Sequence, residues 1–146
     1  MQIINFILPE LFLSLAIMSL LMLGTFIKNS FKLVNLLTIF SIIFTIILVL
    51  NQTSEVNKVF NGSFINDQLS YFMKVITLLF CIFVFLLSKD YMKINKIDYM
   101  EYPILILASV LGMMLMISSY DLIIFYLSLE LQSICLYVLA SIKKND

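Results

Sequence analysis

Residues 122–142 read LIIFYLSLELQSICLYVLASI, a long apolar run in which Glu130 is the one charged side chain. A helix needs about 20 predominantly apolar residues to cross the hydrocarbon core of a bilayer. The run is continuous, whereas a strand of an outer-membrane barrel would alternate apolar and polar residues. Because lipid offers no hydrogen-bond partners, every backbone polar group must be paired within the segment. We therefore predict a transmembrane helix here.

The same pattern occurs four more times along the chain. The further apolar runs cover about residues 5–27, 33–50, 71–88 and 102–118. The sequence therefore predicts an all-α integral membrane protein with five transmembrane helices, forming a single membrane domain over residues 1–146. The polar stretch at 51–70 and the mixed-charge stretch at 89–100 are predicted to be loops on opposite sides of the membrane.

The composition excludes several classes of protein. Of the 146 residues, 62% are hydrophobic and 12% are charged, against roughly 45–50% and 25% in soluble domains. The formal net charge of zero excludes the basic surface that a nucleic-acid-binding protein needs. The chain has no His, and Cys81 and Cys135 lie in apolar runs without metal-ligand spacing. We therefore expect neither a metal nor a cofactor on this chain.

The lysines predict the orientation of the helices. With five spans, seven lysines fall on one side of the membrane and Lys58 alone falls on the other, with Lys74 inside the third span. Loops on the cytoplasmic side carry the excess of Lys and Arg. The N-terminus is therefore predicted to face outside and the C-terminus inside. The seven lysines are Lys28, Lys32, Lys89, Lys93, Lys96, Lys143 and Lys144.

Glu130 is the leading candidate for a functional residue. A charged side chain in the middle of a bilayer costs at least about 2.5–3.5 kcal/mol, so such residues are rare and usually face the protein interior. We expect Glu130 to be protonatable near neutral pH and to act as a proton relay. The alternative is a protonated carboxyl that only donates a hydrogen bond between helices. Polar residues on the same helical stripe could support it: Tyr126, Ser133, Tyr137 and Ser141.

Two further charges lie near the outer edge of the predicted spans. Lys74 is about one turn inside the third span, where a snorkelling side chain that reaches water is the favoured interpretation. Glu10 lies at a similar depth on the first span, after Pro9, which suits the start of a helix. The matched depth and opposite charge raise the hypothesis that Glu10 and Lys74 pair across the first and third helices.

The last two predicted spans carry a resemblance to a known family. Residues 101–106, EYPILI, and residues 118–133, SSYDLIIFYLSLELQS, resemble subunit N of proton-pumping NADH:quinone oxidoreductase, respiratory complex I. The mitochondrial counterpart is NADH dehydrogenase subunit 2. The Leu-Glu-Leu around Glu130 is the most specific element, and the opening LPEL at residues 8–11 also fits.

The resemblance implies an antiporter-like subunit of the membrane arm. In that family the fifth-helix Glu, here Glu130, works with an ion-paired lysine on the seventh helix, and the pair relays protons. The resemblance implies a translocase subunit that carries no redox chemistry itself. NADH, flavin, iron–sulfur clusters and quinone would lie on other subunits. The mitochondrial inner membrane is the expected location, with the bacterial cytoplasmic membrane as the alternative.

The chain is much shorter than the subunits it resembles, which have about fourteen helices arranged around inverted repeats. We therefore expect a split subunit, in which a second, C-terminal chain supplies the intramembrane Lys. The other expected partners are membrane-arm subunits and the lipid bilayer, and no nucleic acid. Two alternatives stay open: the equivalent part of a cation/proton antiporter or membrane-bound hydrogenase, and a structural membrane-assembly subunit without transport.

Overall fold

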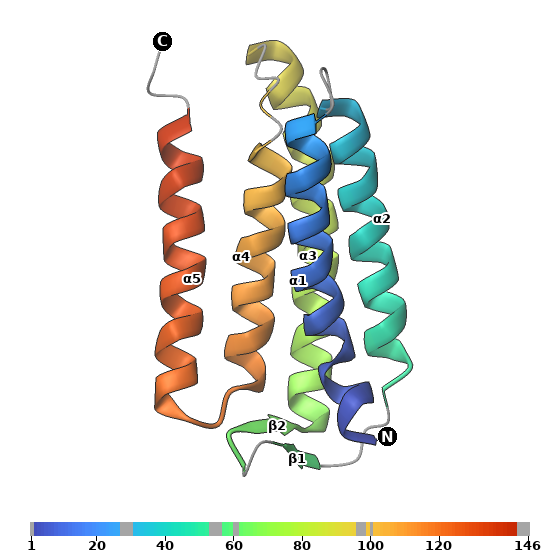
Figure 1. Cartoon of the computed structure of the whole chain (residues 1–146), viewed down its shortest axis with the longest axis vertical. Coiled ribbons are helices and arrows are strands. Elements are labelled where there is room, and N and C mark those ends of the chain that lie inside the picture. Colours follow the sequence, from blue (N-terminus) through green and yellow to red (C-terminus); the bar gives the residue numbers. More distant parts are fainter. Residues whose placement is uncertain are drawn as a thin grey trace.

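A computed structural model of the chain describes residues 2–26, 31–52, 57–59, 62–95, 99 and 101–142. In chain order its elements are α1 (Gln2–Phe26), α2 (Phe31–Leu50), β1 (Asn57–Val59), β2 (Phe64–Asn66), α3 (Gln68–Asn95), α4 (Glu101–Ser118) and α5 (Leu122–Ser141). The helices run side by side along the long axis, and the two strands lie across one end (Figure 1). Within the described residues five helices are long and apolar enough to cross a membrane. This confirms the predicted all-α integral membrane fold.

Three boundaries differ from the prediction. The first helix begins at Gln2, so Pro9 lies inside α1 rather than near its start. The third helix continues to Asn95, so much of the predicted 89–100 loop is helical. Helix formation is cooperative and residues 89–95 contain neither Gly nor Pro, so the helix propagates beyond its apolar part. The predicted 51–70 loop contains an antiparallel hairpin, with β1 paired to β2 and Gly62 turning at a φ of 93°.

The lysines that predict the orientation lie mostly outside the described side chains. The structure describes the side chain of Lys32, which is exposed. It does not describe the side chains of Lys58 or of the other six lysines that set the predicted orientation. Lys28, Lys96, Lys143 and Lys144 lie outside the described residues altogether. The outward N-terminus therefore stays a prediction.

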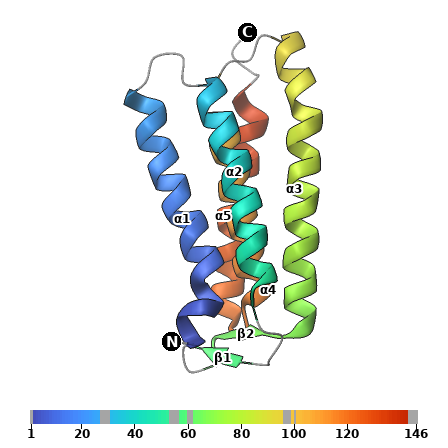
Figure 2. The ribbon, with the colours of Figure 1, turned by 90° about the vertical axis from the view of Figure 1, so that its right-hand side faces the viewer.

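The helix α4 forms the centre of the bundle. It packs against α1, α2, α3 and α5, and half of the residues in its 18-residue apolar stretch are buried. In contrast, α5 lies at the side of the bundle and packs chiefly against α4 (Figures 1 and 2). Only 11% of the residues in its 18-residue apolar stretch are buried. The core consists of apolar side chains from α1 to α4, such as Leu13, Ile42, Leu78 and Leu107, all at 0% exposure. The consequence is an outer helix, α5, with one face against the bundle and the rest uncovered by described residues.

A glycine brings α4 and α5 close together. A Cβ atom added at Gly112 would lie 3.1 Å from the Gln132 backbone nitrogen and 3.1 Å from the Ser128 carbonyl oxygen. Both neighbouring atoms belong to the α5 backbone, which cannot give way as a flexible side chain would. Small residues allow this close helix approach in membranes, where packing rather than the hydrophobic effect holds helices together.

Gly112→Leu is therefore expected to push α5 away from α4. Overpacking of this kind costs about 1–3 kcal/mol, and the loss should appear as a lower midpoint of thermal unfolding in detergent. Ala140→Leu is the matched control because it enlarges a side chain at an exposed position of α5. Equal midpoints for the two variants would contradict close packing at Gly112.

Candidate functional site

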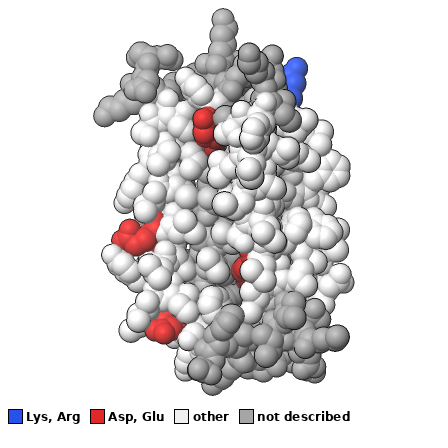
Figure 3. Space-filling model, viewed as in Figure 1, with Lys and Arg blue, Asp and Glu red and all other residues white. Residues whose placement is uncertain are grey.

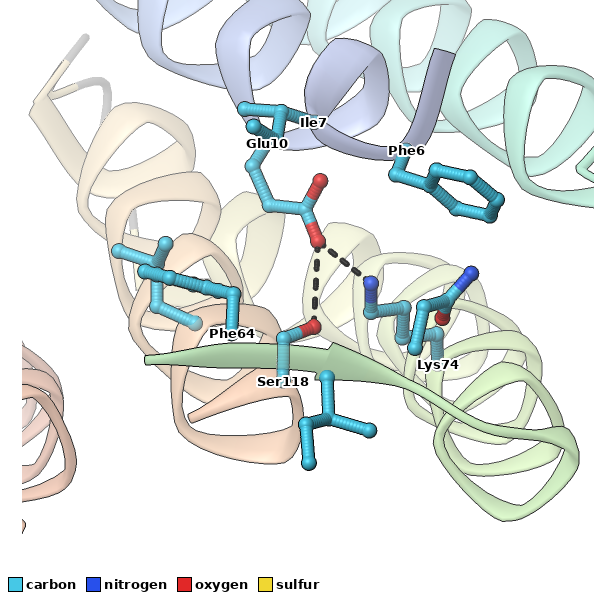
Figure 4. Close-up of a pocket in the computed structure, with 9 residues that line it drawn as sticks. Phe6, Ile7, Glu10, Phe64, Lys74 and Ser118 are labelled. Atoms are coloured by element: carbon cyan, nitrogen blue, oxygen red, sulfur yellow. Dashed lines mark hydrogen bonds and ion pairs between the residues drawn. The ribbon is translucent and has the colours of Figure 1, made fainter. Parts of the chain in front are cut away.

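The first polar site lies where α1, α3 and α4 meet near the hairpin. Glu10 extends from α1 toward Lys74 on α3, and its Oε1 lies 2.6 Å from the Lys74 Nζ (Figure 4). The Ser118 hydroxyl, at the end of α4, donates to the same oxygen over 3.5 Å. Three helices therefore converge on one carboxylate oxygen.

This ion pair is buried. Lys74 is 1% exposed and Glu10 is 6% exposed. The hypothesis that the two residues pair across the first and third helices is confirmed, and the favoured interpretation of Lys74 as a snorkelling side chain is wrong. The physical reason is that an opposite charge at the same depth inside the protein removes the need to reach water, since the attraction is strong at low dielectric.

A small cavity of about 50 Å³ lies beside the pair. Its polar lining comes from Glu10, Lys74, Ser118 and Asn66 (Figure 4). The second carboxylate oxygen, Glu10 Oε2, is buried and has no hydrogen-bond partner among the described residues. An unsatisfied buried acceptor costs about 1–3 kcal/mol, and more when it is charged. The apolar lining residues are Phe6, Ile7, Phe64, Ile65 and Leu115.

A chain of side-chain hydrogen bonds holds the hairpin against the ends of α1, α2 and α3. Gln52 Nε2 donates to the Phe6 carbonyl oxygen over 3.0 Å, and Asn66 Nδ2 donates to Gln52 Oε1 over 3.3 Å. The Ser70 hydroxyl donates to Asn66 Oδ1 over 3.0 Å. On the other side, the Tyr120 backbone N–H donates to the Ser63 carbonyl oxygen over 2.9 Å. The hairpin is thereby fixed as one wall of the cavity.

We expect Asn66→Ala to loosen this wall. The substitution leaves Gln52 Oε1 and the Ser70 hydroxyl without Asn66, which corresponds to a loss of about 1–3 kcal/mol for buried polar groups. Faster hydrogen–deuterium exchange at the backbone amides of residues 62–66 would report it. Asp67→Ala serves as the control because Asp67 is exposed. Exchange that is unchanged in Asn66→Ala would contradict a holding role for this chain.

Glu130 lies elsewhere, on α5. The Asp121 carboxylate accepts a hydrogen bond from the Ile123 N–H and caps the start of this helix. Ser128 and Cys135, the buried residues of α5, fix which side faces the bundle. At 100° per residue, Glu130 points to the opposite side, where Tyr126 and Tyr137 are 61% and 73% exposed. Glu130 itself is exposed in the described part of this chain, and its orientation toward the interior of a larger helix bundle stays a prediction.

Tyr126 and Tyr137 lie on the same face of α5 as Glu130, about one turn before it and two turns after it. The Tyr126 hydroxyl and the Glu130 carboxylate are side-chain neighbours one helical turn apart on this face. The Ser133 hydroxyl instead donates to the Leu129 carbonyl oxygen of its own helix over 2.7 Å. We call Tyr126, Glu130 and Tyr137 the α5 stripe. On the face drawn in Figure 3, the described surface is largely uncharged, with separate acidic spots and a basic group near the upper edge.

The predicted site residues therefore form two groups. Glu10 and Lys74 meet between α1, α3 and α4, whereas the α5 stripe faces away from α4. Ser118 and Asn66 were not predicted as site residues, because their roles depend on contacts across the fold. A signal for Asn66 was present in the chain, since Asn66 and Ser70 are four residues apart at the start of a helix.

A search of curated proteins finds close sequence relatives. A protein from Pelagibacter ubique (strain HTCC1062), named NADH-quinone oxidoreductase subunit N, is 51% identical over 144 residues, which are 98% of this chain and 31% of that protein. The chain is homologous to part of NADH-quinone oxidoreductase subunit N. Subunit N of Paramagnetospirillum magneticum (strain ATCC 700264 / AMB-1) is 41% identical over 96% of this chain and 29% of its own length.

A third subunit N gives the same result. The protein from Maricaulis maris (strain MCS10) is 38% identical over 98% of this chain and 30% of its own length. The chain thus spans about 30% of the length of these subunit N relatives. No family model matches the chain. The resemblance predicted from the residues around Glu130 is confirmed at the level of subunit N.

Proposed function

We propose that this chain is a membrane subunit of a proton-translocating NADH:quinone oxidoreductase and contributes Glu130 to an antiporter-like proton channel. Further transmembrane helices on another polypeptide would complete the channel. The observation that carries the proposal is an exposed carboxylate in the middle of α5, in a chain that spans about 30% of its subunit N relatives.

The energetics of α5 support a partner on the face of the α5 stripe. A carboxylate at mid-bilayer costs at least about 2.5–3.5 kcal/mol, and polar groups at this depth normally pair within a protein or line a water-filled cavity. The exposed side chains of Tyr126 and Tyr137 add two hydroxyl groups to the same face. A cationic side chain on a neighbouring helix, as the resemblance to the antiporter-like family implies, would satisfy Glu130.

The chemistry of such a pair suits proton transfer. A carboxylate beside a cation is ionised, and movement of the cation away favours proton uptake by the carboxylate. The Tyr126 hydroxyl, one helical turn from Glu130, would donate to the carboxylate and fix its orientation. The role of this chain is then to hold and release a proton, while NADH oxidation and quinone reduction take place on other subunits.

The alternatives differ in their support. The names of the relatives favour an NADH:quinone oxidoreductase over a cation/proton antiporter or a membrane-bound hydrogenase. A structural assembly subunit would need no ionisable group in the α5 stripe. The proposed orientation has the N-terminus outside. The proposed location is an energy-conserving membrane, the mitochondrial inner membrane or the bacterial cytoplasmic membrane, and the relatives named above come from bacteria.

The composition of the native complex tests the proposal. The complex is solubilised gently from its membrane, and its polypeptides are identified by mass spectrometry. We expect NADH-oxidising hydrophilic subunits together with a polypeptide that carries an intramembrane Lys. A photo-crosslinker placed at Tyr137 should reach that polypeptide, whereas one at the exposed Phe83 of α3 should give a different product. A complex that lacks NADH-oxidising subunits would refute the proposal.

A further inference from the structure

The buried pair of Glu10 and Lys74 has a feature that the proposed function does not use. We propose that the cavity beside Glu10 binds water, and that this water delivers a proton to Glu10 Oε2. The pair would then be a second protonatable site, separate from Glu130. This inference does not rest on the proposed function, since it concerns contacts within the described part of the chain.

The cavity wall is mostly apolar, and the few hydrogen-bonding groups on it, which include the ion pair, fit water as the ligand. The volume open to the centre of a water molecule is about 50 Å³, and one water molecule needs about 10–15 Å³ of such volume. Glu10 Oε2 offers a buried acceptor without a partner among the described residues, and the Lys74 ammonium has three donors. A water molecule can donate a hydrogen bond to Glu10 Oε2 and accept one from the Lys74 ammonium group.

The balance of charge excludes ions from the same position. Lys74 would repel a cation and Glu10 would repel an anion, and the two charges cancel within 2.6 Å. Among the described lining residues no other titratable side chain faces the cavity from α1, α3, α4 or β2. Asp67, which follows β2, is exposed. A neutral ligand that both donates and accepts hydrogen bonds therefore fits best.

The two carboxylate oxygens have different roles in the proton step. Oε1 is engaged by Lys74 and Ser118, so Oε2 is the atom that can take up a proton. An excess proton on the bound water passes to Oε2, which forms a neutral carboxyl group and restores the water molecule. Release follows the reverse path. The hairpin residues Phe64, Ile65 and Asn66 line the cavity, and the hairpin lies at one end of the bundle (Figure 1).

Carbodiimide labelling tests proton uptake, because a hydrophobic carbodiimide modifies protonated carboxyl groups. The native complex is labelled in the absence of NADH at several pH values, and modified peptides are quantified by mass spectrometry. We expect Glu10 to be modified in the wild type, at a rate that rises about tenfold for each pH unit lowered while the residue is mostly ionised. Modification of Glu130 in the same sample is scored separately, so failure of the proposed function is distinguishable.

Lys74→Met provides the control for access of the reagent. Without its cation Glu10 is held neutral by its apolar surroundings, so it should be modified at every pH tested. If Lys74→Met does not assemble, Lys74→Gln replaces it. A wild-type Glu10 that stays unmodified while the variant is modified would show a permanently closed ion pair and overturn the proposal.

Radiolytic hydroxyl-radical footprinting tests the water itself, because radicals formed from bound water oxidise adjacent side chains. Phe6 lines the cavity at 7% exposure, and Phe85 is a buried comparator at 2% exposure that does not line it. We expect oxidation of Phe6 well above that of Phe85, and its loss in the Glu10→Leu/Lys74→Met double variant. Equal oxidation of Phe6 and Phe85 in the wild type would show a dry cavity and overturn the proposal.

Discussion

Replacing Lys74 with methionine is expected to destabilise the chain by about 3–5 kcal/mol, the usual result of removing one partner from a buried ion pair. Lys74 and Glu10 are almost fully buried, so the substitution leaves the Glu10 carboxyl group without its cation, and both keeping the charge and taking up a proton cost free energy. The free energy of unfolding, measured in mixed detergent micelles, is the quantity to compare.

The double variant Glu10→Leu/Lys74→Met should recover most of this loss. Apolar residues of similar volume remove both buried charges, and such replacements are often neutral or stabilising. Lys32→Met is the matched control, because Lys32 is exposed at the start of α2 and its loss should change stability by less than about 0.5 kcal/mol. A Lys74→Met chain as stable as the Lys32→Met chain would show that the pair contributes nothing.

Replacing Glu130 with glutamine is expected to stop proton transfer through this subunit while leaving assembly intact. Glutamine keeps the size and hydrogen-bonding capacity of glutamate but cannot ionise. Loss of a positioned acid–base group lowers a proton-transfer rate by about 10²-fold or more. Protons translocated per NADH oxidised, measured with the complex in sealed vesicles, is the readout.

Two variants sharpen the result for Glu130. Glu130→Asp retains an acid on the same face and should keep part of the activity, whereas Tyr137→Phe changes another exposed member of the α5 stripe without removing a charge. Unchanged proton translocation in Glu130→Gln would favour a structural assembly subunit over the proposed function.

The helices could be predicted from the sequence because lipid permits few alternatives. Continuous apolar runs such as that over residues 33–50 must form helices, and the predicted and observed bounds of α2 and α5 agree within two residues. Polar helix extensions were missed, as in α3 between Ser88 and Asn95. The length of an apolar run indicates which part of a helix lies in the membrane, but not where the helix itself ends.

The candidate sites were only partly predictable. Charge and depth alone were enough to suggest the pairing of Glu10 with Lys74, but burial decides between pairing and snorkelling, and burial depends on α4 and the hairpin. For Glu130 the helical stripe was readable, while the side that faces the bundle follows from Gly112, Ser128 and Cys135. Which face of an apolar helix packs inward is weakly encoded when all faces are apolar.

The ion pair between α1 and α3 also bears on how the chain enters the membrane during synthesis. Glu10 leaves the ribosome long before Lys74, so α1 must carry an uncompensated carboxyl group until α3 arrives. Ser118 joins the pair only after α4 has followed, and the Tyr120–Ser63 hydrogen bond closes the hairpin later still. Stable integration of the first helix therefore depends on the third, and a chain interrupted before α3 would leave α1 as a substrate for membrane quality control.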